Sequence, residues 1–164
     1  MKVSKKIVLL GHFGVGKSSL IRRFVENIFS EDYKVTIGVH IFKKSISIPE
    51  QDIDVALVLW DLEGNDDINN TRLSYLLGTH AFIYVYDVTR PATYQNLESE
   101  IKFLQDKQPN TPITVVGNKE DLVTKAYLKQ NNENFGNLTD LYVSAKTGNK
   151  VDVLFTNLAE ALIK

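Results

Sequence analysis

The sequence predicts an α/β protein in which helices cover both faces of an open, mostly parallel β-sheet. Short apolar runs alternate along the chain with stretches whose apolar residues recur at helical spacing, and this alternation is typical of such folds. One pair of runs is separated by only a short turn, which indicates a single antiparallel hairpin. Each polar motif follows directly after an apolar run, at the sheet edge where ligands bind in this fold class.

The first strand and the first helix flank a glycine-rich loop. An apolar run at 7–10 precedes residues 11–18, which read G-x-x-x-x-G-K-S, and apolar residues recur at helical spacing over 19–25. Glycines allow successive N–H groups to point inward around an anion, and the N-terminus of the helix adds further donors. Lys17 would then meet the outer phosphates, and the hydroxyl of Ser18 would bind Mg²⁺. The strand and helix on either side make a plain glycine turn the weaker interpretation.

A surface loop is expected over residues 27–38, because this segment has no clear periodicity. Residues 40–48 then alternate between apolar and polar side chains, 49–52 have the composition of a turn, and 55–60 form an apolar run. The alternating segment and the apolar run predict the antiparallel hairpin.

The second half of the chain continues the alternation of strands and helices. Three further strands are predicted at 81–86, 113–116 and 141–143. A helix with Pro91 in its first turn follows the first of these, and its apolar face carries Tyr94, Leu97, Ile101 and Leu104. A short polar helix is predicted within 125–134. The last helix presents one apolar stripe, formed by Val151, Leu154, Phe155, Leu158 and Leu162.

Length and composition indicate an ordinary globular protein. The 164 residues fit a single domain, 1–164, with 43% hydrophobic and 24% charged residues. The net charge of −1 gives no electrostatic reason to expect nucleic acid or an anionic membrane as a partner. The lack of cysteine excludes disulfides, prenylation and palmitoylation in this chain, and Lys2 excludes N-myristoylation. Since no apolar run has the length of a membrane span or signal peptide, a cytoplasmic protein without a lipid anchor is expected.

A D-x-x-G motif, from Asp61 to Gly64, follows the apolar run at 55–60. A carboxylate at this place would lie beside the phosphate loop and hold Mg²⁺ through a water molecule. An Asp at the end of a strand is also common as a turn residue or a helix cap. Its position on the strand after a phosphate loop favours the metal-binding interpretation.

An N-K-x-D motif follows the predicted strand at 113–116, and S-A-K follows the strand at 141–143. The carboxylate of Asp121 would accept two N–H bonds from guanine. Adenine has no such pair of donors at that edge, so the site would discriminate between the two bases. The stem of Lys119 would lie along the base plane, and the backbone N–H of Ala145 would donate to the guanine oxygen. Together the two loops predict a guanine site.

This set of motifs resembles that of the Ras/Rab-like small GTPases. The phosphate loop, a T-I-G loop at 36–38, D-x-x-G, N-K-x-D and S-A-K occur in the order and spacing of that family over nearly the whole chain. The resemblance implies the three-layer α/β fold of a P-loop NTPase G domain, with a six-stranded sheet and about five helices. It also implies GTP or GDP as the ligand, Mg²⁺ as the metal, and hydrolysis of GTP to GDP and phosphate as the reaction.

The resemblance assigns roles to individual residues. The loop around Thr36 would be switch I and residues 61–77 switch II, both ordered by the γ-phosphate and relaxed after hydrolysis. Thr36 would join the magnesium shell and donate its N–H to the γ-phosphate, Phe29 would pack on guanine, and Tyr33 would cover the phosphates. The expected nucleotide-binding residues are Gly14, Val15, Gly16, Lys17, Ser18, Ser19, Phe29, Tyr33, Thr36, Gly64, Asn118, Lys119, Asp121, Ser144, Ala145 and Lys146. The expected metal ligands are Ser18, Thr36 and Asp61, and the expected catalytic residues are Lys17, Thr36, Gly64 and Asn65.

Three departures from the family pattern fall around the expected γ-phosphate. Asn65 stands where the family has a glutamine that orients the attacking water, and its side chain reaches about 1.5 Å less far. Phe13 occupies a loop position where small residues are usual, and its ring would crowd the water or an incoming arginine. Glu63 stands where alanine is usual, and its carboxylate would repel the γ-phosphate unless it turns outward or reaches Mg²⁺.

Each departure also has a simpler interpretation. Asn65 would then face solvent, Phe13 would pack against switch II and Glu63 would cap the following helix, while Asp66 or Asp67 would position the water. We expect a GTP-dependent switch with slow intrinsic hydrolysis, which effector, exchange-factor and activating proteins contact through its switch loops. The alternative is a nucleotide-locked binding module, or pseudo-GTPase, with negligible turnover. A P-loop kinase or ATPase is disfavoured because the two base loops indicate guanine.

Overall fold

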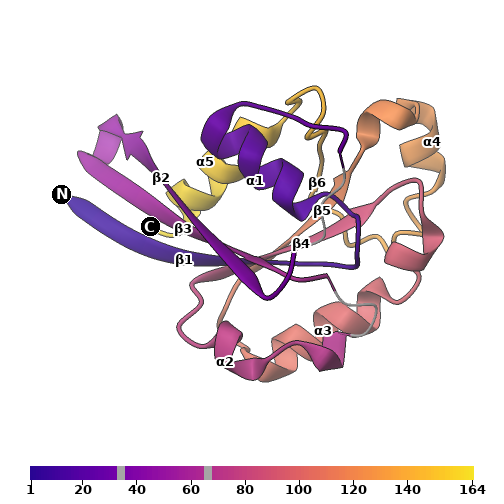
Figure 1. Ribbon diagram of the computed structural model, residues 1–164, viewed down its shortest axis with the longest axis horizontal. Helices are drawn as coiled ribbons and strands as arrows, with labels where there is room; N and C mark the ends of the chain where they lie inside the picture. The colour runs from indigo at the N-terminus through magenta and orange to yellow at the C-terminus, as the bar shows by residue number, and fades with distance from the viewer. Residues whose placement is uncertain (33–35, 65–67) are drawn as a thin grey trace.

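The computed structural model describes residues 1–32, 36–64 and 68–164, and it shows one six-stranded sheet between two layers of helices (Figure 1). The strands are β1 (Lys2–Leu10), β2 (Val39–Ile48), β3 (Ile53–Leu62), β4 (Ala81–Asp87), β5 (Ile113–Asn118) and β6 (Leu141–Tyr142). They lie in the order β2-β3-β1-β4-β5-β6, and β2 and β3 form the antiparallel pair in an otherwise parallel sheet. The predicted α/β fold with a six-stranded, mostly parallel sheet is confirmed.

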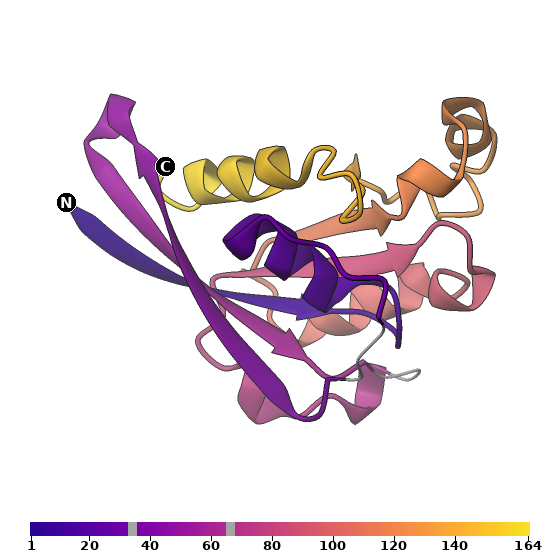
Figure 2. The same ribbon diagram turned by 45° about the horizontal axis from the view of Figure 1, so that its top comes forward.

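Helices cover both faces of the sheet. They are α1 (Lys17–Glu26), α2 (Leu73–Leu76), α3 (Leu97–Lys107), α4 (Lys125–Gln130) and α5 (Val151–Ala161). Figures 1 and 2 show α1 and α5 on one face, and α2 and α3 on the other. Among the described residues, none of the helices combines the length and apolar character that crossing a bilayer requires.

Two apolar cores result, one on each face of the sheet. Side chains of α1 and α5 meet in the first core, where the rings of Phe24 and Phe155 stack with centroids 4.1 Å apart. The second core lies under α2 and α3 and includes Phe135, whose ring packs edge-on against Tyr94. Strand β4 lies between neighbours on both sides and is buried throughout, which explains why its sequence is continuously apolar rather than alternating.

Two elements differ from the sequence-based expectation. Strand β1 begins at Lys2, well before the apolar run, because it pairs in parallel with β3 from Asp54 onward. Pro91 lies in a separate 3₁₀ turn, η3 (Pro91–Thr93), and not in the first turn of α3, which begins at Leu97. The N–H of Tyr94 donates to the carbonyl of Pro91 at 3.1 Å and closes that turn.

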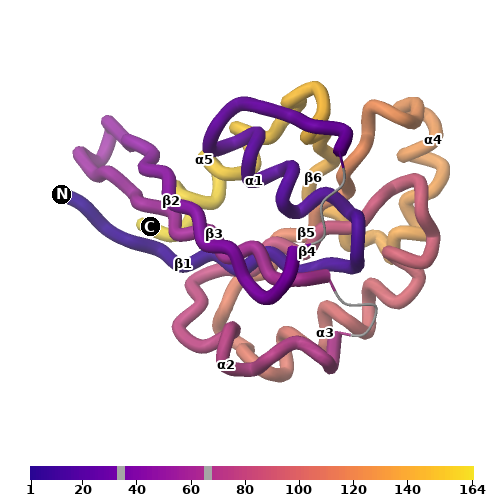
Figure 3. The backbone as a smooth tube through the Cα atoms, in the orientation of Figure 1, coloured from indigo at the N-terminus to yellow at the C-terminus, as the bar shows by residue number. Residues whose placement is uncertain are grey.

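The parallel strands bring the polar motifs to one end of the sheet. The loops that follow β1, β3 and β5 all leave the sheet at its carboxyl edge. This is the edge at which ligands bind in open α/β sheets. Both chain termini lie at the opposite end (Figure 3).

Candidate functional site

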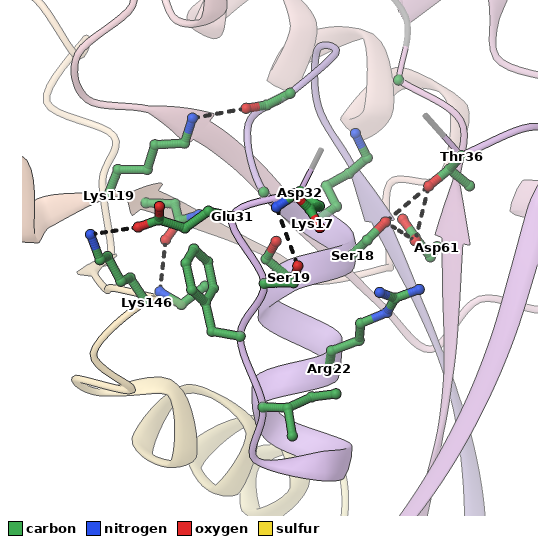
Figure 4. A pocket seen from close by; sticks show the side chains of 18 of the residues that line it. Lys17, Ser18, Ser19, Arg22, Glu31, Asp32, Thr36, Asp61, Lys119 and Lys146 are labelled. Carbon is green, nitrogen blue, oxygen red and sulfur yellow. Dashed lines mark hydrogen bonds and ion pairs between the residues drawn. The ribbon is translucent and has the colours of Figure 1, made fainter. Parts of the chain in front are cut away.

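A cavity of about 550 Å³ lies at the carboxyl edge of the sheet. Its wall combines the loop after β1, the start of α1, residues 28–32, the end of β3 and the loops after β5 and β6. Figure 4 shows side chains from these separate segments turned toward one space. Most residues predicted for the site line this cavity, namely Gly14, Gly16, Lys17, Ser18, Ser19, Phe29, Thr36, Asp61, Gly64, Asn118, Lys119, Asp121, Ala145 and Lys146.

Two of the described residues predicted for the site, Val15 and Ser144, are not part of the cavity wall. Val15 is fully buried in the first core, and its carbonyl accepts a hydrogen bond from Nδ2 of Asn118 at 2.9 Å. Ser144 is also buried and supports the site from behind, because its hydroxyl donates to Oδ1 of Asp121 at 2.8 Å. Tyr33 and Asn65 lie outside the described residues.

Lys17 lies inside the curl of the glycine-rich loop. Its ammonium donates to the carbonyls of Gly11 at 3.1 Å and His12 at 3.2 Å, and the residue is only 6% exposed. Burial lowers the pKa of Lys17 to about 8, and the nearby carboxylate of Asp61 partly opposes that shift. Gly16 caps the following helix with φ of +100°, a conformation that glycine adopts without steric cost.

Three oxygen-bearing side chains meet at the end of the cavity beside Lys17. The hydroxyls of Ser18 and Thr36 lie 2.9 Å apart, and both donate to Oδ2 of Asp61 (Figure 4). Burial raises the pKa of Asp61, while the hydrogen bond from Ser18 and the charge of Lys17 act in the opposite direction. Oδ1 of Asp61 is buried and has no hydrogen-bond partner among the described residues. A set of hard oxygen donors with a spare carboxylate oxygen fits Mg²⁺.

Asn118 connects the phosphate loop to the loop after β6. Its side-chain amide donates to Val15, as noted above, and its Oδ1 accepts the backbone N–H of Ala145 at 3.2 Å. A Cβ atom on Gly16 would lie 2.2 Å from Nδ2 of Asn118. The two loops are therefore packed on one amide group, and glycine at position 16 is required for that close approach.

Lys119 bridges the phosphate loop and β4. Its ammonium donates to the carbonyl of Gly14 at 3.0 Å and forms an ion pair of 2.8 Å with the buried carboxylate of Asp87. These contacts fix the stem of Lys119 in the cavity wall. At the mouth of the cavity, Lys146 pairs with Glu31 at 3.0 Å across the gap between the S-A-K loop and the segment before Thr36 (Figure 4).

Phe13 lies in the cavity wall and is 41% exposed. Its carbonyl accepts a hydrogen bond from Nη1 of Arg90 at 2.8 Å. Gly64 lies directly against the same peptide, since a Cβ on Gly64 would be 2.8 Å from both Cα and N of Phe13. The start of the predicted switch II thus contacts the phosphate loop at Phe13.

Sequence reasoning did not single out several residues that shape the site. Arg22 lines the cavity, and Figure 4 shows its side chain extending from α1 toward Ser18 and Asp61. Its position four residues after Ser18, on the same helix face, was the available signal. Asp87 carried a second signal, as a polar residue that ends an apolar strand. Glu100 on α3 had no local signal, although its carboxylate reaches the phosphate loop.

Comparison with known proteins agrees with this geometry. The model of the Ras family matches residues 6–164. The Ras-related protein RabC of Dictyostelium discoideum is 36% identical over 160 residues, covering 94% of this chain and 82% of that protein. Ras-related protein Rab-30 of Homo sapiens is 36% identical over 163 residues, covering 96% of this chain and 79% of that protein. The chain therefore belongs to the Ras family of small GTPases, as its motifs predict.

Proposed function

We propose that this chain, a single G domain over residues 1–164, is a molecular switch that binds GTP and GDP with Mg²⁺ and hydrolyses GTP slowly by itself. The observation that carries the proposal is the cavity, in which a phosphate loop at one end is joined through Asn118 to two base-contacting loops at the other. A generic phosphate site would have the phosphate loop without the two base-contacting loops.

Guanine specificity is assigned to Asp121. Its carboxylate lines the cavity and accepts the hydroxyl hydrogen of Ser144 on Oδ1, so its orientation is fixed before a ligand arrives. A fixed carboxylate would accept the paired N–H donors of guanine and would be left unpaired by adenine, which is the stronger source of discrimination. Phe29 and Lys119 also line the cavity, and we assign them to the two faces of the base.

The phosphate end is assigned to Lys17 and the three oxygen donors. Lys17 would exchange its bonds to loop carbonyls for bonds to the outer phosphates, where its charge opposes theirs. Ser18, Thr36 and Asp61 would hold Mg²⁺, which neutralises phosphate charge when bound. Backbone N–H groups of the loop from Gly14 to Ser19 and the start of α1 would complete the anion site.

Slow hydrolysis follows from the residues around the expected γ-phosphate. Asn65 has a shorter reach than the glutamine usual in the family, and a misplacement of about 1 Å costs on the order of a hundredfold in rate. Phe13 is 41% exposed and lines the cavity, and its backbone lies against Gly64. We infer that its ring occupies space that the attacking water or an arginine from an activating protein would need.

A nucleotide-locked binding module is the second candidate, and the same position of Phe13 favours it. The two functions differ in the fate of bound GTP. The purified chain, loaded with GTP and kept in Mg²⁺, would be sampled over hours and its nucleotide analysed by chromatography. Slow conversion to GDP supports a GTPase, whereas GTP that remains intact at a time exceeding several exchange half-lives supports the locked module.

Partners are assigned to the surface of the switch loops. Exposed apolar side chains lie on these loops or directly beside them, at Ile37, Ile41, Leu73 and Leu77. We propose that effector, exchange-factor and activating proteins contact this surface, whose shape would depend on the bound nucleotide.

Base specificity provides the direct test of the proposal. Binding of GDP and ADP is compared for the native chain and for Asp121→Ala, with Glu120→Ala as the matched control. Glu120 neighbours Asp121, but its carboxylate binds Asn149 outside the cavity wall. We expect GDP to bind far more tightly than ADP, and Asp121→Ala to weaken GDP binding by about a hundredfold or more. Equal binding of ADP and GDP by the native chain would refute the guanine assignment.

A further inference from the structure

Glu63 follows β3 directly, and its side chain turns toward the segment that precedes β2. Its Oε2 accepts the backbone N–H of Gly38 at 3.3 Å, and its own N–H donates to the carbonyl of Gly38 at 2.9 Å. Glu63 is not part of the cavity wall. The carboxylate of Glu63 therefore binds the backbone of the segment that precedes β2.

This contact continues the β2–β3 ladder beyond its last regular pair, Val39 with Leu62. Gly38 has φ of +73°, and a Cβ built there would meet nothing within 4 Å. Because the backbone leaves the extended conformation at Gly38, the ladder does not continue through main-chain groups alone. The carboxylate of Glu63 therefore accepts the hydrogen bond from the N–H of Gly38, in place of a main-chain carbonyl.

A second hydrogen bond joins the same two segments, two residues before Gly38 on one and two residues before Glu63 on the other. Thr36 donates its hydroxyl to Oδ2 of Asp61 at 3.3 Å, just as Gly38 donates its N–H to Glu63. The end of the predicted switch I is therefore held against the end of β3 at two points. One point uses the predicted metal-binding carboxylate, and the other uses a carboxylate with no role in the proposed function.

We propose that Glu63 is a positioning residue that holds residues 36–38, here called the Thr36 loop, closed against the end of β3 whether or not a γ-phosphate is present. This inference rests on the proposed switch function, in which the γ-phosphate is the anion that orders switch I. Here Glu63 supplies an anion from the chain itself, and it acts on Thr36 through Gly38. The closed loop would then persist in the GDP form, and the two nucleotide states would differ less around Thr36.

The closed loop also affects the relative affinity for the two nucleotides. The apparent affinity for a ligand that needs the closed arrangement is proportional to the fraction of molecules that are closed, so it falls when that fraction falls. GTP uses Thr36 for its γ-phosphate under the proposed function, whereas GDP has no such group. Removal of the Glu63 contact would therefore weaken GTP binding relative to GDP binding. If Glu63 instead mainly repelled the γ-phosphate, its removal would strengthen GTP binding relative to GDP binding. The direction of this change therefore distinguishes positioning from repulsion.

The first test follows the amide of Gly38 by NMR hydrogen exchange in the GDP-bound protein. Glu63→Ala removes the acceptor, Glu63→Gln keeps an acceptor without the charge, and Glu50→Ala is the control at the far end of the same hairpin. We expect Glu63→Ala to accelerate exchange about five- to tenfold, the scale of one hydrogen bond. Glu63→Gln should stay within about twofold of the native protein, and Glu50→Ala should match it. Equal exchange in the native protein and Glu63→Ala would overturn the proposal.

The second test measures the dissociation constants of GDP and of a non-hydrolysable GTP analogue for the same variants. Glu63→Ala should raise the ratio of the analogue dissociation constant to the GDP dissociation constant about three- to tenfold. Glu63→Gln should have a ratio close to that of the native protein. A lower ratio in Glu63→Ala would show that repulsion dominates and would overturn the positioning role. If the chain binds neither nucleotide, the proposed function fails, yet exchange at Gly38 in the ligand-free protein still decides whether Glu63 holds the loop.

Discussion

Nε2 of His12 lies 2.9 Å from Oε1 of Glu100, and each side chain is only 8% exposed. His12 is the second residue of the phosphate loop, and Glu100 belongs to α3, 88 positions later. We assign the hydrogen of this pair to Nε2, because carboxylate oxygens are hydrogen-bond acceptors. The contact holds the first turn of the phosphate loop against the helix that covers the sheet.

Substitution of Glu100 by leucine should destabilise the fold, because it removes the acceptor that faces a buried imidazole. We expect a loss of about 1–3 kcal/mol in the free energy of unfolding, measured by urea denaturation. Glu100→Gln keeps an acceptor and should lose less. Glu98→Leu, at an exposed position on the same helix, is the control and should stay within about 0.5 kcal/mol. A loss no greater than in the control would contradict this account of the pair.

Substitution of Phe13 by glycine should accelerate GTP hydrolysis. The change removes the ring from the cavity wall and opens the space that the attacking water needs. We expect the rate of hydrolysis to increase about 10- to 100-fold when Phe13→Gly is combined with Asn65→Gln. The double variant removes the crowding by the ring and restores the reach of the glutamine. Single-turnover hydrolysis of bound GTP measures the rate, and Phe13→Leu, which keeps apolar bulk, should remain slow. An unchanged rate in the double variant would exclude this explanation of slow turnover.

Substitution of Gly64 by alanine should separate switch II from the phosphate loop. The added methyl group would lie 2.8 Å from the backbone of Phe13, and such overpacking costs about 1–3 kcal/mol. We expect the affinity for a non-hydrolysable GTP analogue to fall by about tenfold relative to GDP, on the same energy scale. Gly78→Ala is the control, because a Cβ at Gly78 meets nothing within 4 Å, although the φ of +69° there strains any side chain. It should cost stability and leave the nucleotide ratio unchanged.

His80 should make the fold less stable in mild acid. Its Nδ1 accepts the backbone N–H of Lys6 at 2.9 Å. Burial lowers the pKa of His80, as do the charges of Lys5 and Lys6. The unfolded chain therefore binds the proton first as pH falls, so stability is lost from about pH 6.5 downward. Urea midpoints at pH 7 and pH 5.5 should differ more for the native protein than for His80→Asn, and an equal difference would count against the assignment.

Much of the site was predictable because its chemistry depends on local sequence. The G-x-x-x-x-G-K-S loop requires glycine conformations and a helix N-terminus, and both are encoded within eight residues. The two loops predicted to contact the base could be picked out for the same reason, since each combines a strand end with a short polar motif. Their side chains line one cavity because parallel strands deliver their carboxyl ends to a single edge.

What needed the tertiary structure were the partners of each polar group. Glu63 accepts a hydrogen bond from the backbone of Gly38, in a loop 25 residues earlier. Pro91 closes its own 3₁₀ turn before α3 begins. The same holds for the buried acids Asp87 and Glu100, because the Lys119 and His12 side chains that pair with them lie far away in sequence. Nothing in the neighbouring residues specifies such contacts, because they depend on how separate elements pack.

The sequence by itself determined the fold class and the family, and it predicted the phosphate loop, the guanine motifs and the three departures around the expected γ-phosphate. It did so because hydrophobic periodicity and loop conformation are properties of short segments. Only the tertiary structure decided that Phe13 stands in the cavity wall against Gly64, and that Glu63 is bound to Gly38. Those placements depend on how the β2–β3 hairpin, the end of β3 and the phosphate loop pack against one another, which short segments of sequence do not specify.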